Sequence, residues 1–289
     1  MTTSLFIIVL IAAVFHATWN FYARKMSGNL VVFWFSMWVS VLFLTPFAIG
    51  LTVLSGTDAI LAMYRDGYVY MVGTGIFHIA YFLLLARAYE HGEISVVYPV
   101  ARGSGIGATA FCGWMFLQET ITGIGAVGIG LVCVGILSMG AGVIRQSEQA
   151  MEGFRSALGV GITIIGYSLI DKMGVGVVNP ILYIWTMFLV TALAIWPLVV
   201  SRHGGELREI LRVSRRAILI IGIGAAGTYM TILFAFTMGP VGYIVALREF
   251  AVVVGALLGV AFLKEQLTAG KITAIVAITV GLVCIKLAN

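Results

Sequence analysis

The sequence predicts an all-α membrane protein with ten transmembrane helices, arranged as two inverted five-helix repeats around a central cavity. Three observations support this fold. The 289 residues are 61% hydrophobic and 10% charged, with a mean hydropathy of +1.08, whereas a soluble domain is about 25% charged. Apolar segments long enough to cross a bilayer recur along the chain, and the second half repeats motifs of the first.

Each predicted span contains about 20 mostly apolar residues, the length that crosses a bilayer at 1.5 Å per residue. The expected spans are residues 3–23, 30–54, 67–89, 94–118, 123–143, 157–174, 180–200, 217–237, 241–263 and 269–288. The longest connections are expected at 55–66, 144–156 and 201–216. Because the connections are short, no soluble domain is expected.

The first apolar segment is interpreted as a spanning helix. Its basic residues, Arg24 and Lys25, follow the apolar run, whereas a signal peptide carries them before it.

We assign residues 1–143 to the first repeat, 144–156 to a cytoplasmic linker and 157–289 to the second repeat.

The two halves share motifs in a constant register. The stretch FLQETITG (116–123) returns as FLKEQLTAG (262–270), and an offset of 146 also places Arg102 on Arg248. Five spans per half is an odd number, so the halves are expected in opposite orientations, as in many transporters. The glutamates of these turns lie at helix ends, where a structural or gate-supporting role is expected.

These motifs resemble those of the drug/metabolite transporter superfamily, specifically its EamA-type members. The resemblance rests on HATWN (16–20), on the FLQET and FLKEQ turns and on the five-plus-five repeat; SVVYPVARG and YIVALRE are similar to the fourth and ninth helices of one EamA subgroup. It implies a ten-helix basket whose cavity is lined mainly by spans one, three, four, six, eight and nine. Spans five and ten would pack peripherally. The resemblance does not specify a substrate.

Lys and Arg are distributed unequally between the two predicted sides. The odd-numbered connections and their flanks carry twelve, and the other side carries only Arg65, Lys172 and Lys286. Positive residues favour the cytoplasmic side, so we expect a multi-pass protein of the cell inner membrane with both termini outside. Similar family members are more often drawn with both termini inside, so this sequence departs from that pattern.

Several function classes are disfavoured by the residue patterns. The net charge of +5 comes from connections rather than from one basic face, so no nucleic-acid partner is expected. Cys112, Cys133 and Cys284 form no paired motif, so no metal site is expected. GIGAVG (123–128) and GIGAAG (222–227) lack the strand context of a dinucleotide site and are interpreted as helix-packing glycines. We expect neither a cofactor nor an enzyme.

The strongest candidate substrate-binding residues are three charges within predicted spans. Arg102, Arg248 and Glu249 would each cost about 2.5–3.5 kcal/mol to insert without compensation. Neighbouring helix residues point about 100° apart, so we expect Glu249 to pair with Arg102 while Arg248 binds a substrate carboxylate or phosphate. The alternative is an ion network that only locks spans four and nine together.

An aromatic and amide face in the first span provides further candidates. Trp19 and Asn20 lie three and four residues after His16, on one helix face, and are suited to stacking on and hydrogen bonding a small polar solute. The alternatives are an interface anchor and a helix-packing amide. Tyr81 and Tyr98 are additional candidates for lining the cavity.

Span six places Tyr167 and Asp171 one turn apart, as a cavity contact or as simple end-capping. Histidine titrates in the range useful for proton relay, although a buried structural histidine is the alternative. The candidates for proton coupling or gating are His16, His78, Asp171 and Glu249.

The function these features predict is secondary transport of a small polar organic metabolite by alternating access. The expected substrate is a zwitterion or an anion, such as an amino acid or related carboxylate. The alternative is a non-transporting subunit that binds a partner or handles lipid. The expected partners are the substrate, membrane lipid, a coupling proton and a second copy contacting helices five and ten.

Overall fold

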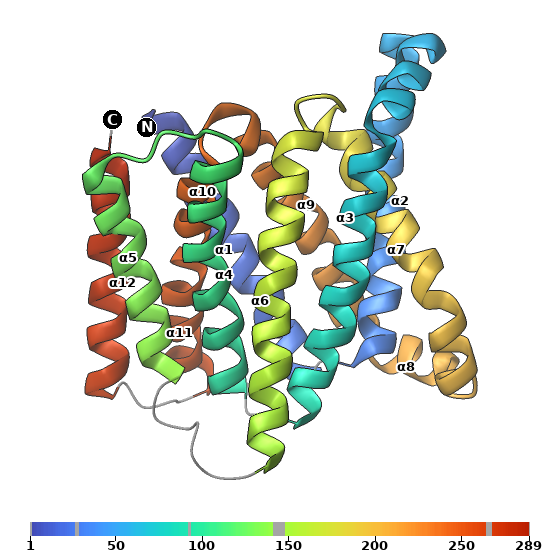
Figure 1. Ribbon diagram of the computed structural model, residues 1–289. Helices are drawn as coiled ribbons and strands as arrows, with labels where there is room; N and C mark the ends of the chain where they lie inside the picture. The colour runs from blue at the N-terminus through green and yellow to red at the C-terminus, as the bar shows by residue number, and fades with distance from the viewer. Residues whose placement is uncertain (1, 27–28, 92–93, 141–147, 264–267, 289) are drawn as a thin grey trace.

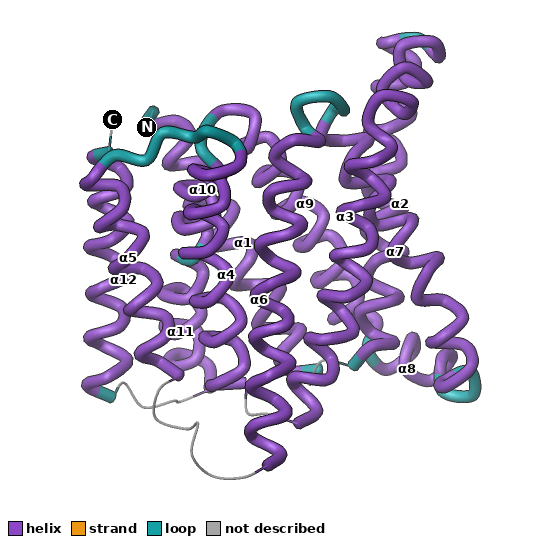
Figure 2. The backbone as a smooth tube through the Cα atoms, viewed as in Figure 1, coloured by secondary structure: helices purple, strands orange, loops and turns teal. Residues whose placement is uncertain are grey.

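The computed structural model describes residues 2–26, 29–91, 94–140, 148–263 and 268–288. Every regular element within these ranges is a helix (Figure 2). The helices are α1 (Thr3–Lys25), α2 (Leu30–Ser55), α3 (Thr57–His91), α4 (Ile94–Phe116), α5 (Gly123–Gly140), α6 (Glu148–Gly174), α7 (Pro180–His203), α8 (Leu207–Val213), α9 (Arg215–Met238), α10 (Val241–Arg248), α11 (Phe250–Leu263) and α12 (Ala269–Leu287).

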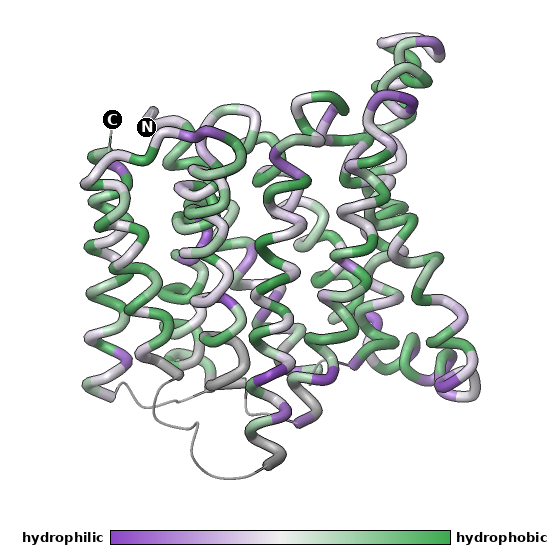
Figure 3. The backbone as a smooth tube through the Cα atoms, viewed as in Figure 1, coloured by the Kyte–Doolittle hydropathy of each residue, from purple (hydrophilic) through white to green (hydrophobic). Residues whose placement is uncertain are grey.

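The long helices lie side by side, with both termini at one end of the molecule and α8 at the other (Figure 1). We call these the termini end and the α8 end. Apolar residues dominate the middle of the helices, and polar residues gather toward the ends (Figure 3). Within the part of the chain that the structure describes, eight helical segments are long and apolar enough to cross a membrane, one of them made of α10 and α11 together. The chain is therefore a multi-pass membrane protein; ten spans and inverted halves stay predictions.

Two predicted boundaries are wrong. The expected connection at 55–66 is largely helical, because α3 begins at Thr57 and Gly56 alone joins it to α2. Gly56 has φ +82°, a conformation that glycine adopts without a side-chain clash. The expected linker at 144–156 is helical from Glu148 onward. The predicted ninth span is recovered as one apolar segment, Val241–Phe262, within which Glu249 separates α10 from α11.

Two of the helices begin at asparagine caps. The Asn29 side chain accepts hydrogen bonds from the backbone N–H groups of Val31 and Val32 at 2.9 and 3.1 Å. Asn179 accepts one from Ile181 at 3.0 Å, and Pro180 follows it at the first helical position. These contacts satisfy N–H groups that have no partner within the helix.

The glycine motifs serve helix packing, as predicted. A Cβ atom on Gly128 would lie 2.7 Å from the Gly281 carbonyl oxygen, and one on Gly281 would lie 2.6 Å from the Gly128 oxygen. A Cβ atom on Gly224 would lie 2.8 Å from Trp19 Cβ. Small residues thus allow α5 to pack against α12 at one edge of the bundle, and α9 against α1 (Figure 1).

Candidate functional site

The break between α10 and α11 lies at one of the predicted site residues. The N–H of Glu249 donates to the Ala246 carbonyl at 3.1 Å, and Val252 donates to the Glu249 carbonyl at 2.9 Å. Both bonds span three residues, the spacing of a 3₁₀ turn rather than of an α-helix. Interrupted helices commonly form substrate sites in transporters, so the break strengthens the case for a site here.

Four buried polar side chains meet at this break, and we call them the arginine cluster: His16, Arg102, Arg248 and Glu249. Arg102 Nη1 lies 3.3 Å from Glu249 Oε1, which is the predicted pair. Arg248 Nε approaches the same oxygen at 3.8 Å. Arg102 Nη2 donates to His16 Nε2. The cluster therefore joins α1, α4 and the α10–α11 break.

Arg248 retains hydrogen-bonding capacity in this cluster. Its Nε and Nη2 atoms are buried, and neither has a hydrogen-bond partner among the described residues. The same holds for Trp19 Nε1 on α1 and Thr228 Oγ1 on α9. Buried polar groups are usually satisfied because leaving them unpaired costs about 1–3 kcal/mol. Buried donors without a described hydrogen-bond partner thus lie on three of the helices that are expected to line the cavity. Such donors are suited to binding a polar ligand.

A second group of polar side chains surrounds Asp171 on α6, and we call it the tyrosine cluster. Asp171 is fully buried. Its Oδ1 accepts a hydrogen bond from the Tyr183 hydroxyl at 2.9 Å, and its Oδ2 accepts one from the Tyr229 hydroxyl. His78 Nδ1 lies 2.9 Å from the Thr74 carbonyl oxygen. Asp171 therefore accepts hydroxyl hydrogen bonds from two other helices, α7 and α9.

Aromatic rings complete the tyrosine cluster. The His78 ring centroid lies 4.5 Å from that of Tyr167, 5.4 Å from Tyr229 and 6.4 Å from Tyr81. The structure thus brings together the predicted residues of spans three and six. Sequence reasoning missed Tyr183, Tyr229 and Thr74. Their only sequence signal was a polar group within an apolar span.

Arg248 lies within electrostatic range of both clusters, because its charge acts on His16, His78 and Asp171. One buried cation therefore lies within range of the carboxylates of both clusters, Glu249 and Asp171.

The candidate residue Asn20 hydrogen-bonds within its own helix, because its Nδ2 donates to the His16 carbonyl oxygen at 2.8 Å. Tyr98 belongs to α4, but its side chain lies outside the described part of the structure.

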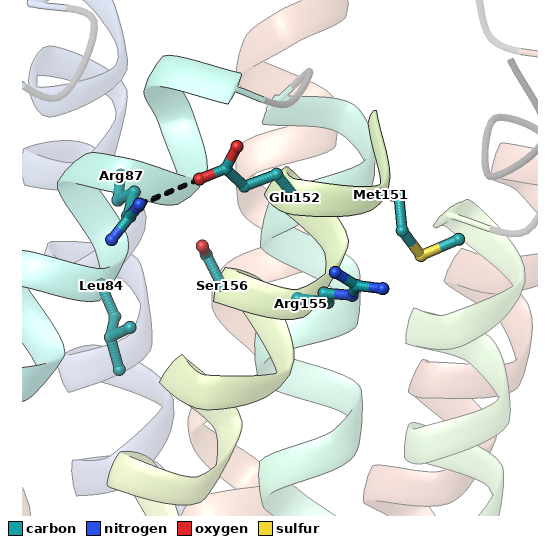
Figure 4. A pocket seen from close by; sticks show the side chains of 6 residues that line it. All are labelled: Leu84, Arg87, Met151, Glu152, Arg155 and Ser156. Carbon is teal, nitrogen blue, oxygen red and sulfur yellow. Dashed lines mark hydrogen bonds and ion pairs between the residues drawn. The ribbon is translucent and has the colours of Figure 1, made fainter. Parts of the chain in front are cut away.

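A cavity of about 650 Å³ opens between α3 and α6 toward the α8 end. It is lined by Leu84, Arg87, Met151, Glu152, Arg155 and Ser156 (Figure 4). Within it, Arg87 Nη2 and Glu152 Oε1 form an ion pair at 3.1 Å. The predicted site residues are not among these lining residues.

The chain is similar to a known transporter family, to a curated protein and to solved structures. The model of the EamA-like transporter family matches residues 3–141 and again 153–287. A stretch of 93 residues is 32% identical to the spermidine export protein MdtI of Cronobacter sakazakii (strain ATCC BAA-894), covering 31% of this chain and 83% of that protein. One solved crystal structure is similar over 99% of both chains with a TM-score of 0.77. At 15% identity, that similarity shows the fold alone.

Proposed function

Because the chain belongs to the EamA-like transporter family, we propose that it is a secondary transporter of a small polar organic metabolite. The substrate is a zwitterion or an anion, such as an amino acid or related carboxylate. Transport proceeds by alternating access between two inverted five-helix halves, residues 1–143 and 157–289, around a central cavity. The protein lies in the cell inner membrane with both termini outside.

The proposal rests mainly on Arg248, a buried cation with hydrogen-bond donors that have no described partner. Its guanidinium is buried at an interrupted helix, and its Nε and Nη2 have no hydrogen-bond partner among the described residues. The planar fork of arginine suits bidentate binding of a carboxylate or phosphate. Trp19 Nε1 and Thr228 Oγ1, both buried donors without a described partner, supply further bonds to the substrate.

The tyrosine cluster contributes the other half of the substrate specificity. Asp171 provides a negative charge and the rings of Tyr81 and Tyr167 provide apolar faces, which suit the amine of a zwitterion. Asp171, with His16, His78 and Glu249, is also a candidate for carrying a coupling proton. Of these, Asp171 is the preferred candidate because two phenol hydroxyls hold its fully buried carboxylate.

A polyamine is the second candidate substrate, favoured by the similarity to a spermidine export protein. Spermidine carries several positive charges, whereas two of the four residues of the arginine cluster are cations. Repulsion from Arg102 and Arg248 favours the zwitterion or anion instead.

Purified protein in liposomes separates these candidates. Thermal stability is first measured against a panel of amino acids, related carboxylates and spermidine, because a ligand that binds the folded state raises stability. Uptake of each stabilising compound is then measured in radiolabelled form. Stabilisation and uptake of a zwitterion or carboxylate supports the proposal. Uptake of spermidine alone assigns the polyamine, and folded protein that transports no member of the panel contradicts both candidates.

A further inference from the structure

A charged contact at the termini end joins the turn after α4 to the second half of the chain. Both carboxylate oxygens of Glu119 accept from the backbone N–H of Val241, the first residue of α10, at 2.9 Å. Lys172 Nζ, near the end of α6, lies 3.7 Å from Glu119 Oε1. We call Glu119, Lys172 and Val241 the clasp.

The lysine of the clasp also holds the end of α9. Lys172 Nζ donates to the carbonyl oxygens of Phe236 and Gly239, which have no helical partner at a C-terminus. Glu119 stabilises the N-terminus of α10 and Lys172 the C-terminus of α9, so each charge suits the helix end that it contacts. The Glu119–Lys172 ion pair and these hydrogen bonds together connect the turn after α4 with α6, α9 and α10.

Other features of the chain are adapted to this contact. Gln118 has φ +54°, uncommon for a residue other than glycine, and turns the chain immediately before Glu119. A Cβ atom on Gly113 would lie 2.9 Å from Glu119 Oε2 and 2.8 Å from Val241 Cγ1. Glycine at 113 thus leaves the space that the carboxylate occupies.

The sequence contains a counterpart of the clasp lysine in the first half. Lys25-Met26 and Lys172-Met173 are 147 residues apart, the same spacing as AYEHG (88–92) and AFTMG (235–239). Lys25 ends α1 and is exposed, with its Nζ 4.6 Å from the centroid of the Phe21 ring. Glu265, the repeat counterpart of Glu119, lies outside the described residues.

We propose that the clasp is the gate that closes the termini end, and that it breaks whenever the substrate site opens toward that end. This inference rests on the proposed alternating-access transport. Asp171 and Lys172 are consecutive, so a displacement of the end of α6 that breaks the clasp also moves Asp171 relative to Tyr183 and Tyr229. The gate is thereby linked to the tyrosine cluster.

The test measures side-specific accessibility beneath the clasp. Cys112, Cys133 and Cys284 are replaced, and Ser168→Cys is introduced as the reporter. Ser168 is fully buried one helical turn, about 6 Å, inward from Lys172. A membrane-impermeant maleimide is applied to sealed vesicles from each side in turn, with the orientation established by protease access to a terminal tag.

Breaking the clasp is expected to expose the reporter to the termini side only. Labelling from that side should rise about tenfold or more in Glu119→Ala, less in Glu119→Gln, and also in Gly113→Ala and Lys172→Met. Labelling from the α8 side should not rise, whereas general loosening would increase labelling from both sides. A charge swap is not expected to restore closure, because each charge would then face the wrong helix end.

Two matched controls accompany these variants. Asp66→Asn removes an exposed ion pair with Arg65, whose Nε and the Asp66 Oδ1 are 2.9 Å apart, and Gly130→Ala adds a methyl group where no atom lies within 4 Å. Neither should change the labelling. If Lys172→Met does not fold, Glu119→Gln and Gly113→Ala decide the outcome.

Unchanged labelling in folded Glu119 and Gly113 variants, or equal increases from both sides, would overturn the gate. The labelling requires no substrate. Altered labelling in a protein that transports nothing would show that the clasp closes the termini end, and would contradict the proposed transport.

Discussion

Arg102 of α4 and Glu249 at the α10–α11 break form a buried ion pair, with Nη1 and Oε1 3.3 Å apart. The Arg102 side chain is 6% exposed and that of Glu249 is fully buried. The two residues are 147 positions apart in the sequence, so this contact is tertiary. It ties together the two halves of the chain at the helix break.

Removal of one partner of this pair is expected to be more destabilising than removal of both. Arg102→Met or Glu249→Leu alone should lower the free energy of unfolding by about 3–5 kcal/mol, because the remaining charge is left buried. The double variant should recover part of that loss, because Arg248, which also approaches Glu249, then loses this carboxylate; a double-mutant cycle in detergent measures the coupling. Glu152→Gln, which breaks the partly exposed pair with Arg87, is the control and should have little effect. Additive losses would show that the pair contributes no coupling.

Arg248→Lys is expected to weaken substrate binding while leaving the fold intact. Lysine keeps the positive charge but lacks the planar fork that binds a carboxylate through two parallel hydrogen bonds. The apparent affinity should fall about tenfold or more, which corresponds to about 1.4 kcal/mol. Ligand-induced thermal shift and uptake measure this change. Unaltered affinity would remove Arg248 from the substrate site.

Asp171→Asn is expected to abolish uptake that a proton gradient drives, because an amide cannot bind and release the proton. Exchange of substrate across the membrane without a gradient should persist. Tyr183→Phe and Tyr229→Phe each remove one hydrogen bond to the carboxylate, a loss of about 1.5–3 kcal/mol for a charged acceptor. They should therefore impair gradient-driven uptake less severely.

Tyr64→Phe is the matched control for these phenol variants. Its hydroxyl lies 2.9 Å from Thr186 Oγ1, outside the tyrosine cluster. This variant should transport normally. Gradient-driven uptake that survives in Asp171→Asn would assign the coupling proton to another residue.

The contact between α5 and α12 is expected to tolerate no side chain at its glycines. Gly281→Ala should destabilise the protein by about 1–3 kcal/mol, since the new methyl group would press on the Gly128 carbonyl. Gly130→Ala on α5 has open space and should be neutral or slightly stabilising. Thermal unfolding in detergent compares the two. Equal stability of both variants would contradict the close packing.

The orientation of the protein is testable at two exposed serines. Ser55 ends α2 at the termini end, and Ser201 lies near the end of α7 on the α8 side (Figure 1). The twelve-to-three distribution of Lys and Arg predicts that the termini end faces outward. A cysteine at Ser55 should react with an impermeant thiol reagent added to intact cells, and one at Ser201 only after the membrane is opened. The reverse pattern would place both termini inside.

The membrane class, the family and the approximate positions of most helices are determined by the sequence alone. Each span must satisfy its own backbone hydrogen bonds within lipid, so a long apolar segment predicts a helix independently of the rest of the fold. The cost of burying charge likewise identified Arg102, Arg248 and Glu249 as exceptional without any structure. The helical extensions at Thr57 and Glu148 were missed because polar residues are compatible with a helix that extends beyond the apolar run.

The partners of these residues were decided only by the tertiary structure. The pairing of Arg102 with Glu249 was predicted from the requirement that a buried charge be compensated. The meeting of Asp171 with Tyr183 and Tyr229, and of Lys172 with Glu119, was not predicted. Helical spacing determines which residues share a face of one helix. Which faces meet depends on how the helices rotate and pack against one another, through contacts between residues far apart in the sequence.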